Sequence, residues 1–223
     1  MDRYLNRQAA GQMLATALAQ YAKKKEALVL ALPRGGVPVG YEIAKALQTP
    51  LDVFIVRKLG VPGHEELAMG AIAMGGICIL NDNIIRELRI SPEAIKRVSQ
   101  EEQKELERRI ERYRGSQPFP TLSKRLIILV DDGIATGATI RAAVTALKKE
   151  KPAKLIIAVP VAEKSTCEKL SALVDQFICP LRPLYFNAVG TWYESFDQTS
   201  DEEVRSLLKK AKKFEAVAHR ESE

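Results

Sequence analysis

Short runs of mostly apolar residues recur along the chain, and each is followed at once by proline or charged residues. Runs of this length that end in turn chemistry predict strands buried on both faces of a parallel sheet. The four clearest runs lie at residues 27–32, 51–56, 126–130 and 155–159. After the first run, apolar positions recur at helical spacing, at Ile43, Ala44 and Leu47. Strands that alternate with helices predict an α/β fold with a doubly wound parallel sheet.

The pattern also predicts helices at residues 3–24 and 91–113, paired strands at 69–80 and a short strand near Phe177. In the longer charged helix, Ser91 suits the N-cap and Pro92 the first helical position. Apolar residues are sparse in this helix, so we expect residues 83–115 to form an exposed excursion from the core. Such an excursion could serve as a dimer arm, and we expect a homodimer.

Length and composition limit the architecture. With 223 residues, 46% of them hydrophobic, the chain can bury one good core, so we expect a single domain over residues 1–223. Cys78, Cys167 and Cys179 are too few and too widely spaced for a metal cluster or a disulfide framework. There is no signal-peptide pattern, and no apolar run approaches the ~20 residues that span a bilayer. The cytoplasm is therefore the expected location, with no membrane partner.

The net charge of +6 raises the question of nucleic-acid binding. Its distribution argues against that function, because the lysines gather near predicted helix C-termini, where cations offset the helix dipole. These clusters lie at residues 23–25, 148–151 and 209–213. Neither a DNA-binding motif nor an aromatic ladder accompanies them. We therefore expect no nucleic-acid partner, although a basic molecule would attract an anionic substrate.

The most informative segment is residues 126–139, LIILVDDGIATGAT. Asp131 and Asp132 follow a predicted parallel strand, at the edge where α/β sheets bind ligands, and adjacent carboxylates can accept hydrogen bonds from two ribose hydroxyls. The small residues and hydroxyls that follow, together with a helix N-terminus, suit a phosphate. These residues are Gly133, Ala135, Thr136, Gly137, Ala138 and Thr139. The pattern predicts a ribose 5-phosphate site, and the alternative is an ordinary turn with Thr136 as N-cap.

A second glycine-rich turn follows the first strand, in ALPRGGVPVG at residues 31–40. The planar guanidinium of Arg34 suits bidentate phosphate contact, and Gly35 and Gly36 leave backbone N–H groups open to an anion. Alone, the two glycines could simply make a tight turn. Together with the 126–139 segment, they favour a second phosphate subsite.

A third segment, LGVPGHEE at residues 59–66, is polar and lacks hydrophobic periodicity, as in a mobile lid. Arg57 and Lys58 stand at its base. Acid or base candidates within the lid are His64, Glu65 and Glu66, although a lone loop histidine is more often solvated surface.

Residues 126–139 resemble the motif by which type I phosphoribosyltransferases bind 5-phosphoribosyl 1-diphosphate (PRPP), ending in Thr-Gly-x-Thr. The resemblance implies a pyrophosphate turn, often with a cis peptide, at Arg34, Gly35 and Gly36, with Arg57 and Lys58 meeting the same group. It also implies a lid that excludes water and Mg²⁺ bound with PRPP, oriented indirectly by Asp131 and Asp132. The expected catalytic residues are Asp131, Asp132, Lys58 and Glu66.

The acceptor is less clearly indicated. The 6-oxopurine branch of the family carries Asp where this chain has Ala135, and Ala there resembles the adenine branch. Residues 183–204, the expected hood over the site, are rich in aromatic rings that could stack a base, Trp192 among them, or simply close the sheet edge. Over nearly its full length the chain resembles bacterial phosphoribosyltransferases of unassigned acceptor. We expect transfer to a nitrogen nucleophile, with a PRPP or nucleotide sensor and a PRPP-hydrolysing enzyme as alternatives.

Overall fold

A computed structural model describes residues 3–220, without the side chains of Glu66 and residues 215–220. Its centre is a five-stranded sheet in the order β2-β1-β6-β7-β8, in which every neighbouring pair is parallel. The strands are β1 (Ala27–Ala31), β2 (Leu51–Val53), β6 (Leu126–Val130), β7 (Lys154–Ala158) and β8 (Gln176–Ile178). Every residue of β1 and β6 is buried, as their continuous apolar sequences predict.

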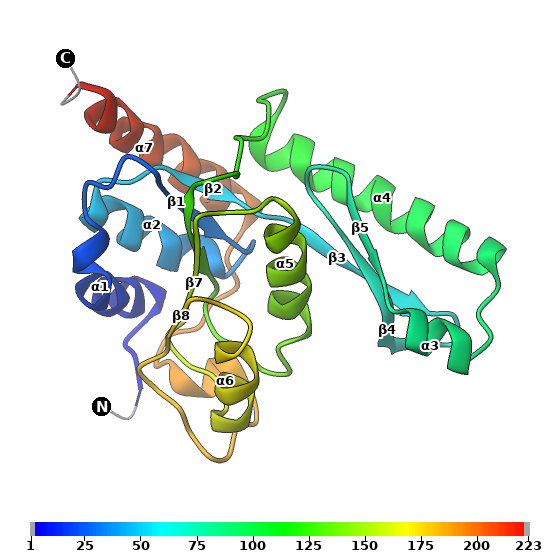
Figure 1. Cartoon of the computed structure of the whole chain (residues 1–223). Coiled ribbons are helices and arrows are strands. Elements are labelled where there is room, and N and C mark those ends of the chain that lie inside the picture. Colours follow the sequence, from blue (N-terminus) through cyan, green and yellow to red (C-terminus); the bar gives the residue numbers. More distant parts are fainter. Residues whose placement is uncertain (1–2, 221–223) are drawn as a thin grey trace.

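Helices cover both faces of this sheet, and Figure 1 shows α1, α2 and α7 on one side and α5 and α6 on the other. Their bounds are α1 (Arg7–Ala17), α2 (Gly36–Leu47), α5 (Ala138–Lys149), α6 (Lys164–Ser171) and α7 (Asp201–Arg220). Two short 3₁₀ helices lie at Ala19–Tyr21 and Val189–Trp192. The predicted doubly wound α/β fold is thus confirmed.

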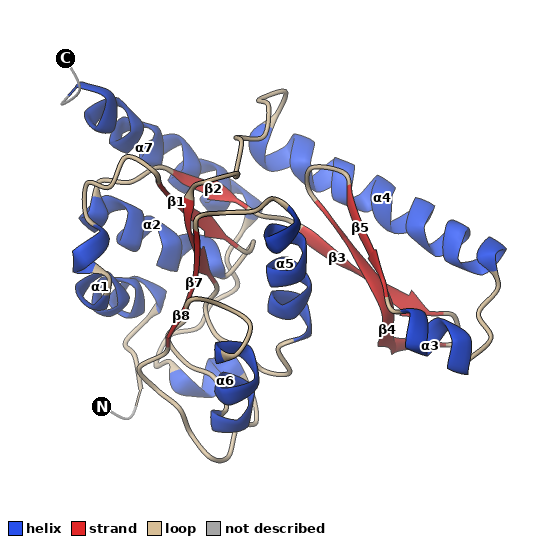
Figure 2. Cartoon of the chain, viewed as in Figure 1, coloured by secondary structure: helices blue, strands red, loops and turns tan. Residues whose placement is uncertain are grey.

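Residues 56–114 form an arm that projects from the sheet (Figures 1 and 2). Its antiparallel strands, in the order β3-β4-β5, pack against α5 and α4. The elements of the arm are β3 (Val56–Val61), β4 (His64–Ala73), β5 (Ile77–Leu80), α3 (Asp82–Glu87) and α4 (Pro92–Arg114). Ser91 accepts a hydrogen bond from the Ala94 N–H at 3.2 Å, which confirms the predicted cap. At the far end of α4, Arg114 binds the Asp52 carboxylate through bonds of 2.9 Å, so the arm is tied back to β2.

Several predicted boundaries were wrong. The strand expected at residues 51–56 ends at Val53, and residues 59–66 are largely the strands and turn of the β3–β4 hairpin instead of a structureless loop. The predicted helix at residues 3–24 ends at Ala17, followed by a 3₁₀ turn. The lysines at residues 209–213 lie inside α7, away from a helix end. Within residues 3–220, no helix combines the length and apolar content that crossing a membrane requires.

Candidate active site

The two glycine-rich motifs meet at the point where the strand order reverses. From β1 the chain moves to β2 on one side, whereas β6, β7 and β8 follow one another on the other side of β1. The carboxyl ends of β1 and β6 therefore flank a crevice, which is where open α/β sheets bind ligands. The turn at residues 33–36 follows β1, and Asp131 and Asp132 follow β6.

The turn at residues 33–36 lies directly against the two carboxylates. A Cβ atom on Gly35 would overlap an Asp132 carboxylate oxygen, and one on Gly36 would lie 2.8 Å from the Val130 carbonyl oxygen. Only glycine allows so close an approach at both positions. The peptide bond between Pro33 and Arg34 is cis. The structure thus brings Gly35 and Gly36 together with the acidic pair.

Next to the acidic pair, the loop before α5 encloses a hollow of about 120 Å³. The residues that line it are Asp131, Gly133, Ile134, Ala135, Thr136, Gly137, Ala138, Thr139 and Ile140. Gly137 is the N-cap of α5 and has a φ of 75°, a left-handed conformation that favours glycine. Free N–H groups and the positive end of the helix dipole face a small space, which is the arrangement that binds an anion.

Asp132 is held by two residues that were not among the predicted site residues. The Arg7 Nε donates to its carboxylate at 2.8 Å, and the Tyr193 hydroxyl donates to its backbone carbonyl at 2.5 Å. The Arg7 guanidinium also lies 3.8 Å from the centre of the Phe196 ring and donates to the Asp197 carbonyl. Arg7 thereby joins the start of α1, the acidic pair and the hood.

A signal for Arg7 existed in the sequence. Asn6 caps α1 by accepting a hydrogen bond from the Ala9 N–H at 2.9 Å, so Arg7 is the first helical residue. A cation there opposes the helix dipole, which normally favours acidic residues in the first turn. A basic residue directly after an N-cap therefore suggests a tertiary partner.

Electrostatics distinguish the two carboxylates. Burial raises the pKa of Asp131, the neighbouring Asp132 charge raises it further, and Arg7 partly opposes both effects. Burial likewise raises the pKa of the Tyr193 hydroxyl, which stays a hydrogen-bond donor at neutral pH. The acidic pair is therefore short of positive charge, and hydroxyl donors or a cation beside Asp131 would stabilise its ionised form.

Arg34 is positioned by the beginning of α7. Its Nη1 lies 3.9 Å from an Asp201 carboxylate oxygen, and its side chain is 37% exposed. Asp201 also accepts a bond of 2.5 Å from the Tyr113 hydroxyl and pairs with Arg112 at 2.8 Å. Burial and this hydrogen bond raise the pKa of Tyr113 to about 12. Asp201, which the sequence did not indicate, thus links the arm to the residue expected to bind pyrophosphate.

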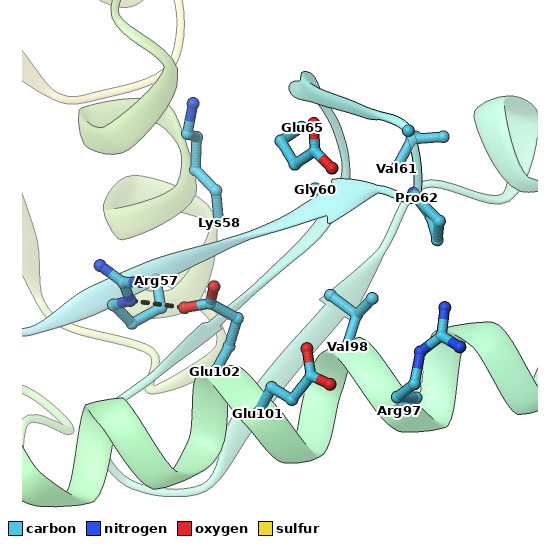
Figure 3. A pocket seen from close by; sticks show the side chains of 11 residues that line it. Arg57, Lys58, Gly60, Val61, Pro62, Glu65, Arg97, Val98, Glu101 and Glu102 are labelled. Carbon is cyan, nitrogen blue, oxygen red and sulfur yellow. Dashed lines mark hydrogen bonds and ion pairs between the residues drawn. The ribbon is translucent and has the colours of Figure 1, made fainter.

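Arg57 and Lys58 are neighbours in β3, so their side chains leave opposite faces of the strand. Arg57 donates to Glu102 of α4 at 2.6 Å, whereas the Lys58 ammonium points away from that helix (Figure 3). Both residues line a cavity of about 510 Å³ between the hairpin and α4, as does Glu65. In this structure Arg57 is therefore engaged within the arm. His64 is exposed at the hairpin turn, and the side chain of Glu66 lies outside the described part.

The hood closes over the loop after β6. A Cβ on Gly133 would lie 2.5 Å from a Val189 methyl group, so the hood rests on this glycine. Trp192 stacks on Phe186 with ring centres 6.3 Å apart. The Trp192 Nε1 is buried without a hydrogen-bond partner, the one such side-chain atom among the described residues. Trp192 thus has a packing role and an unused donor.

Comparison with known proteins fits this geometry. A family model described as the phosphoribosyl transferase domain matches residues 1–194. The chain belongs to this family. A Mycobacterium tuberculosis H37Rv protein provisionally named a phosphoribosyl transferase is 43% identical over 211 residues, which are 95% of this chain and 47% of that protein. The chain thus spans about half the length of the curated relatives it matches.

The fold is shared with a protein from Thermus thermophilus. Its crystal structure matches with a TM-score of 0.84 at 38% identity, over 93% of this chain and 98% of that one. The predicted resemblance to phosphoribosyltransferases is therefore confirmed, and so is the type I fold class.

For a phosphoribosyltransferase domain, the acidic pair is a suitable place for a divalent cation that is held mainly by substrate. Asp131 and Asp132 supply hard oxygen donors, which Mg²⁺ prefers. Among the described residues there is no group of three or more His, Cys, Asp or Glu side chains placed to hold a metal. Substrate oxygens and water would have to complete the coordination shell, as is usual for Mg²⁺ beside phosphates.

Proposed function

We propose that this domain transfers the 5-phosphoribosyl group of PRPP to a nitrogen nucleophile and releases pyrophosphate. The observation that carries this proposal is the convergence of three features at one switch point: the glycine turn after β1, the acidic pair after β6, and the hollow at the start of α5. A ligand that fits all three has a phosphate and a diphosphate at opposite ends of a dihydroxylated sugar.

Each part of the crevice has a role in the proposed reaction. Thr136, Thr139 and the free N–H groups of the hollow bind the 5-phosphate. Asp131 and Asp132 accept hydrogen bonds from the ribose hydroxyls and offset the positive charge that develops as the bond from C1 to the diphosphate breaks. Mg²⁺ bound with PRPP would neutralise charge on the leaving group.

We assign the leaving pyrophosphate to Arg34 and the backbone N–H groups of Gly35 and Gly36, with Lys58 approaching from the hairpin. Arg57 would join them only if it left Glu102, so its role as a pyrophosphate ligand depends on movement of the arm. Closure of the hairpin, which also carries Glu66, would exclude water from C1 while the nitrogen forms its bond there.

The acceptor site is assigned to the space beneath the hood. We propose that the aromatic rings of the hood stack a flat heterocycle and that a movement of the hood exposes the buried Trp192 Nε1 as a donor to it. With Ala135 in place of the carboxylate that the 6-oxopurine branch carries, recognition of the base cannot rely on an acid at that position. We therefore favour a purine-like base whose contacts come from the hood.

Mass spectrometry of products tests this proposal. The protein is incubated with PRPP, Mg²⁺ and a panel of bases and amines, beside a sample that lacks acceptor and a sample of the Asp131→Asn/Asp132→Asn variant. A phosphoribosylated acceptor that forms only with the unaltered protein supports transfer. Pyrophosphate release without acceptor would favour hydrolysis, and calorimetric PRPP binding without any product would favour a sensor.

A further inference from the structure

A second region suited to anions lies where the end of α4 meets α7. Two cavities of about 490 and 440 Å³ adjoin there, since both are lined by Asp52, Arg114, Gln117 and Lys212. We call them together the groove. Leu51, which begins β2, and Arg125, which precedes β6, both line it, so it extends toward the amino ends of these strands. The proposed transfer site lies at their carboxyl ends.

The groove has an excess of positive charge that the cavity beside the hairpin and the hollow before α5 lack. The larger cavity is lined by five basic and two acidic residues. The cavity beside the hairpin has three of each, and the hollow before α5 has one acid and no base. Arg114 is neutralised by Asp52, and it is nearly buried, with 6% of its side chain exposed. Arg112 pairs with Asp201 at 2.8 Å. The cations left to meet a ligand are Arg125 on the strand side and Arg205, Lys209 and Lys212 of α7.

The two lysines of α7 are the most available of these cations. Lys209 and Lys212 are three residues apart on one face of the helix, both are exposed, and neither has an ion pair within the described part of the chain. Arg205 pairs with Glu202 at 3.0 Å, but Glu202 is 69% exposed, and such surface pairs are weak. An anion entering the groove would gain contacts without breaking a buried ion pair.

We propose that the groove binds a short linear chain of phosphates, such as a tripolyphosphate or the triphosphate of a nucleotide. Cations on two facing walls suit a ligand with charge along its length more than a single phosphate. The lining offers no exposed aromatic ring for stacking a base, because Tyr113 is buried and its hydroxyl is bound to Asp201. This absence argues against single-stranded nucleic acid, which usually requires such platforms.

Calorimetry with inorganic tripolyphosphate on the full-length protein tests the proposal. The Lys209→Ala/Lys212→Ala variant removes the two available cations. The matched control is Lys210→Ala/Lys213→Ala, which removes the same charge at the same spacing from the same helix, outside the groove lining. We expect the first variant to bind tripolyphosphate at least tenfold more weakly, and the control to change by less than twofold.

Equal weakening in both variants would overturn the proposal by showing a net-charge effect, and no weakening in either would place tripolyphosphate elsewhere. PRPP affinity should be unchanged in the Lys209→Ala/Lys212→Ala variant. A loss of PRPP affinity would overturn the claim that the groove is separate from the transfer site. Because this measurement is independent of transfer, a failed transfer assay leaves the groove proposal standing.

A parallel titration with ATP shows whether a nucleoside adds affinity to the phosphate chain. Tighter binding of a 12-nucleotide RNA than of tripolyphosphate would overturn the assignment in favour of nucleic acid.

Discussion

The crevice and the arm both contain ion pairs between arginine and acidic side chains, with different surroundings. In the crevice, Arg7 and Asp132 are 12% and 14% exposed, and the pair lies among the hood, α1 and β6. In the arm, Glu105 pairs with Arg108 and Arg109 of its own helix at 2.7 Å, and Arg108 is 57% exposed. The pair that joins distant segments fixes the geometry of a site, whereas the pair within one helix adds little beyond local helix stability.

Asp132→Asn should have the largest effect, because it removes a charge placed both to accept a ribose hydroxyl and to hold Arg7. We expect PRPP affinity to fall on the order of 100-fold, the upper part of the range for losing a charge-assisted contact. Glu105→Gln is the matched change in the arm and should leave PRPP affinity within about twofold. Isothermal calorimetry measures both, with circular dichroism to verify folding. Equal PRPP affinities for the two variants would show that Asp132 does not contribute to PRPP binding.

Arg34→Ala should weaken PRPP more than ribose 5-phosphate, because only PRPP carries the diphosphate. A loss of about 1.5 to 3 kcal/mol corresponds to roughly 10- to 100-fold for PRPP, with little change for the monophosphate. The arm counterpart is Arg57→Ala, which should cost less because Arg57 is paired with Glu102. Competition titrations with both ligands decide the matter. If the two variants lose PRPP affinity equally, the arm closes over the diphosphate and Arg57 binds it.

Sequence patterns predicted the crevice more accurately than the arm for a physical reason. Strands buried on both faces, such as β6, are continuous apolar runs, and a ligand-binding turn at a strand end depends on adjacent residues. In the arm, β3 is only partly buried, so its sequence VRKLGV shows neither strict alternation nor a continuous run. Arg57 and Lys58 therefore did not look like strand residues, although β3 directs their side chains to opposite faces.

The identity of long-range partners was beyond the sequence patterns. Arg7 and Asp132 are separated by 125 positions, and Asp201 stands 167 positions after Arg34 (201 − 34). No local spacing encodes such contacts, since they arise only when α1 and α7 pack beside the sheet. Aromatic density indicated the hood, but its contact with Gly133 through Val189 emerged only from the structure.

Arg7→Met tests whether the pair in the crevice positions Asp132. We expect PRPP affinity to fall roughly tenfold, at the low end of the cost of losing a hydrogen bond to a charged group. Arg7 also lowers the pKa of Asp131, so its loss should raise that pKa and move the onset of PRPP binding to higher pH. Arg108→Met is the control in the arm and should change neither quantity. Arg7→Lys should restore the pH profile in part, whereas a merely structural role would leave this profile unmoved.

The smallest expected effect is the change in stability on Asp131→Asn, which is opposite in sign to the change in its counterpart in the arm. Because the folded pKa of Asp131 is raised above 3.8, the folded protein binds more protons than the unfolded chain, and this residue costs stability as pH rises above about 4. The variant should therefore gain stability over the unaltered protein between pH 4 and pH 7 while losing PRPP affinity. Each 1 kcal/mol gained would raise Tm by about 2 to 4 °C.

Glu105 provides the opposite case, because hydrogen bonds from Arg108 and Arg109 lower its pKa to about 2. Its stabilising contribution is present above pH 4.5, the ordinary value, and is lost as pH falls toward 2. Glu105→Gln should therefore lose a little stability at pH 7 and none at the acid end. Thermal melts of both variants across this range, without ligand, compare the two regions directly. If the Tm difference between Asp131→Asn and the unaltered protein does not change with pH, the Asp131 carboxylate has the same pKa in the folded and unfolded states. The crevice would then have no deficit of positive charge for PRPP and Mg²⁺ to relieve.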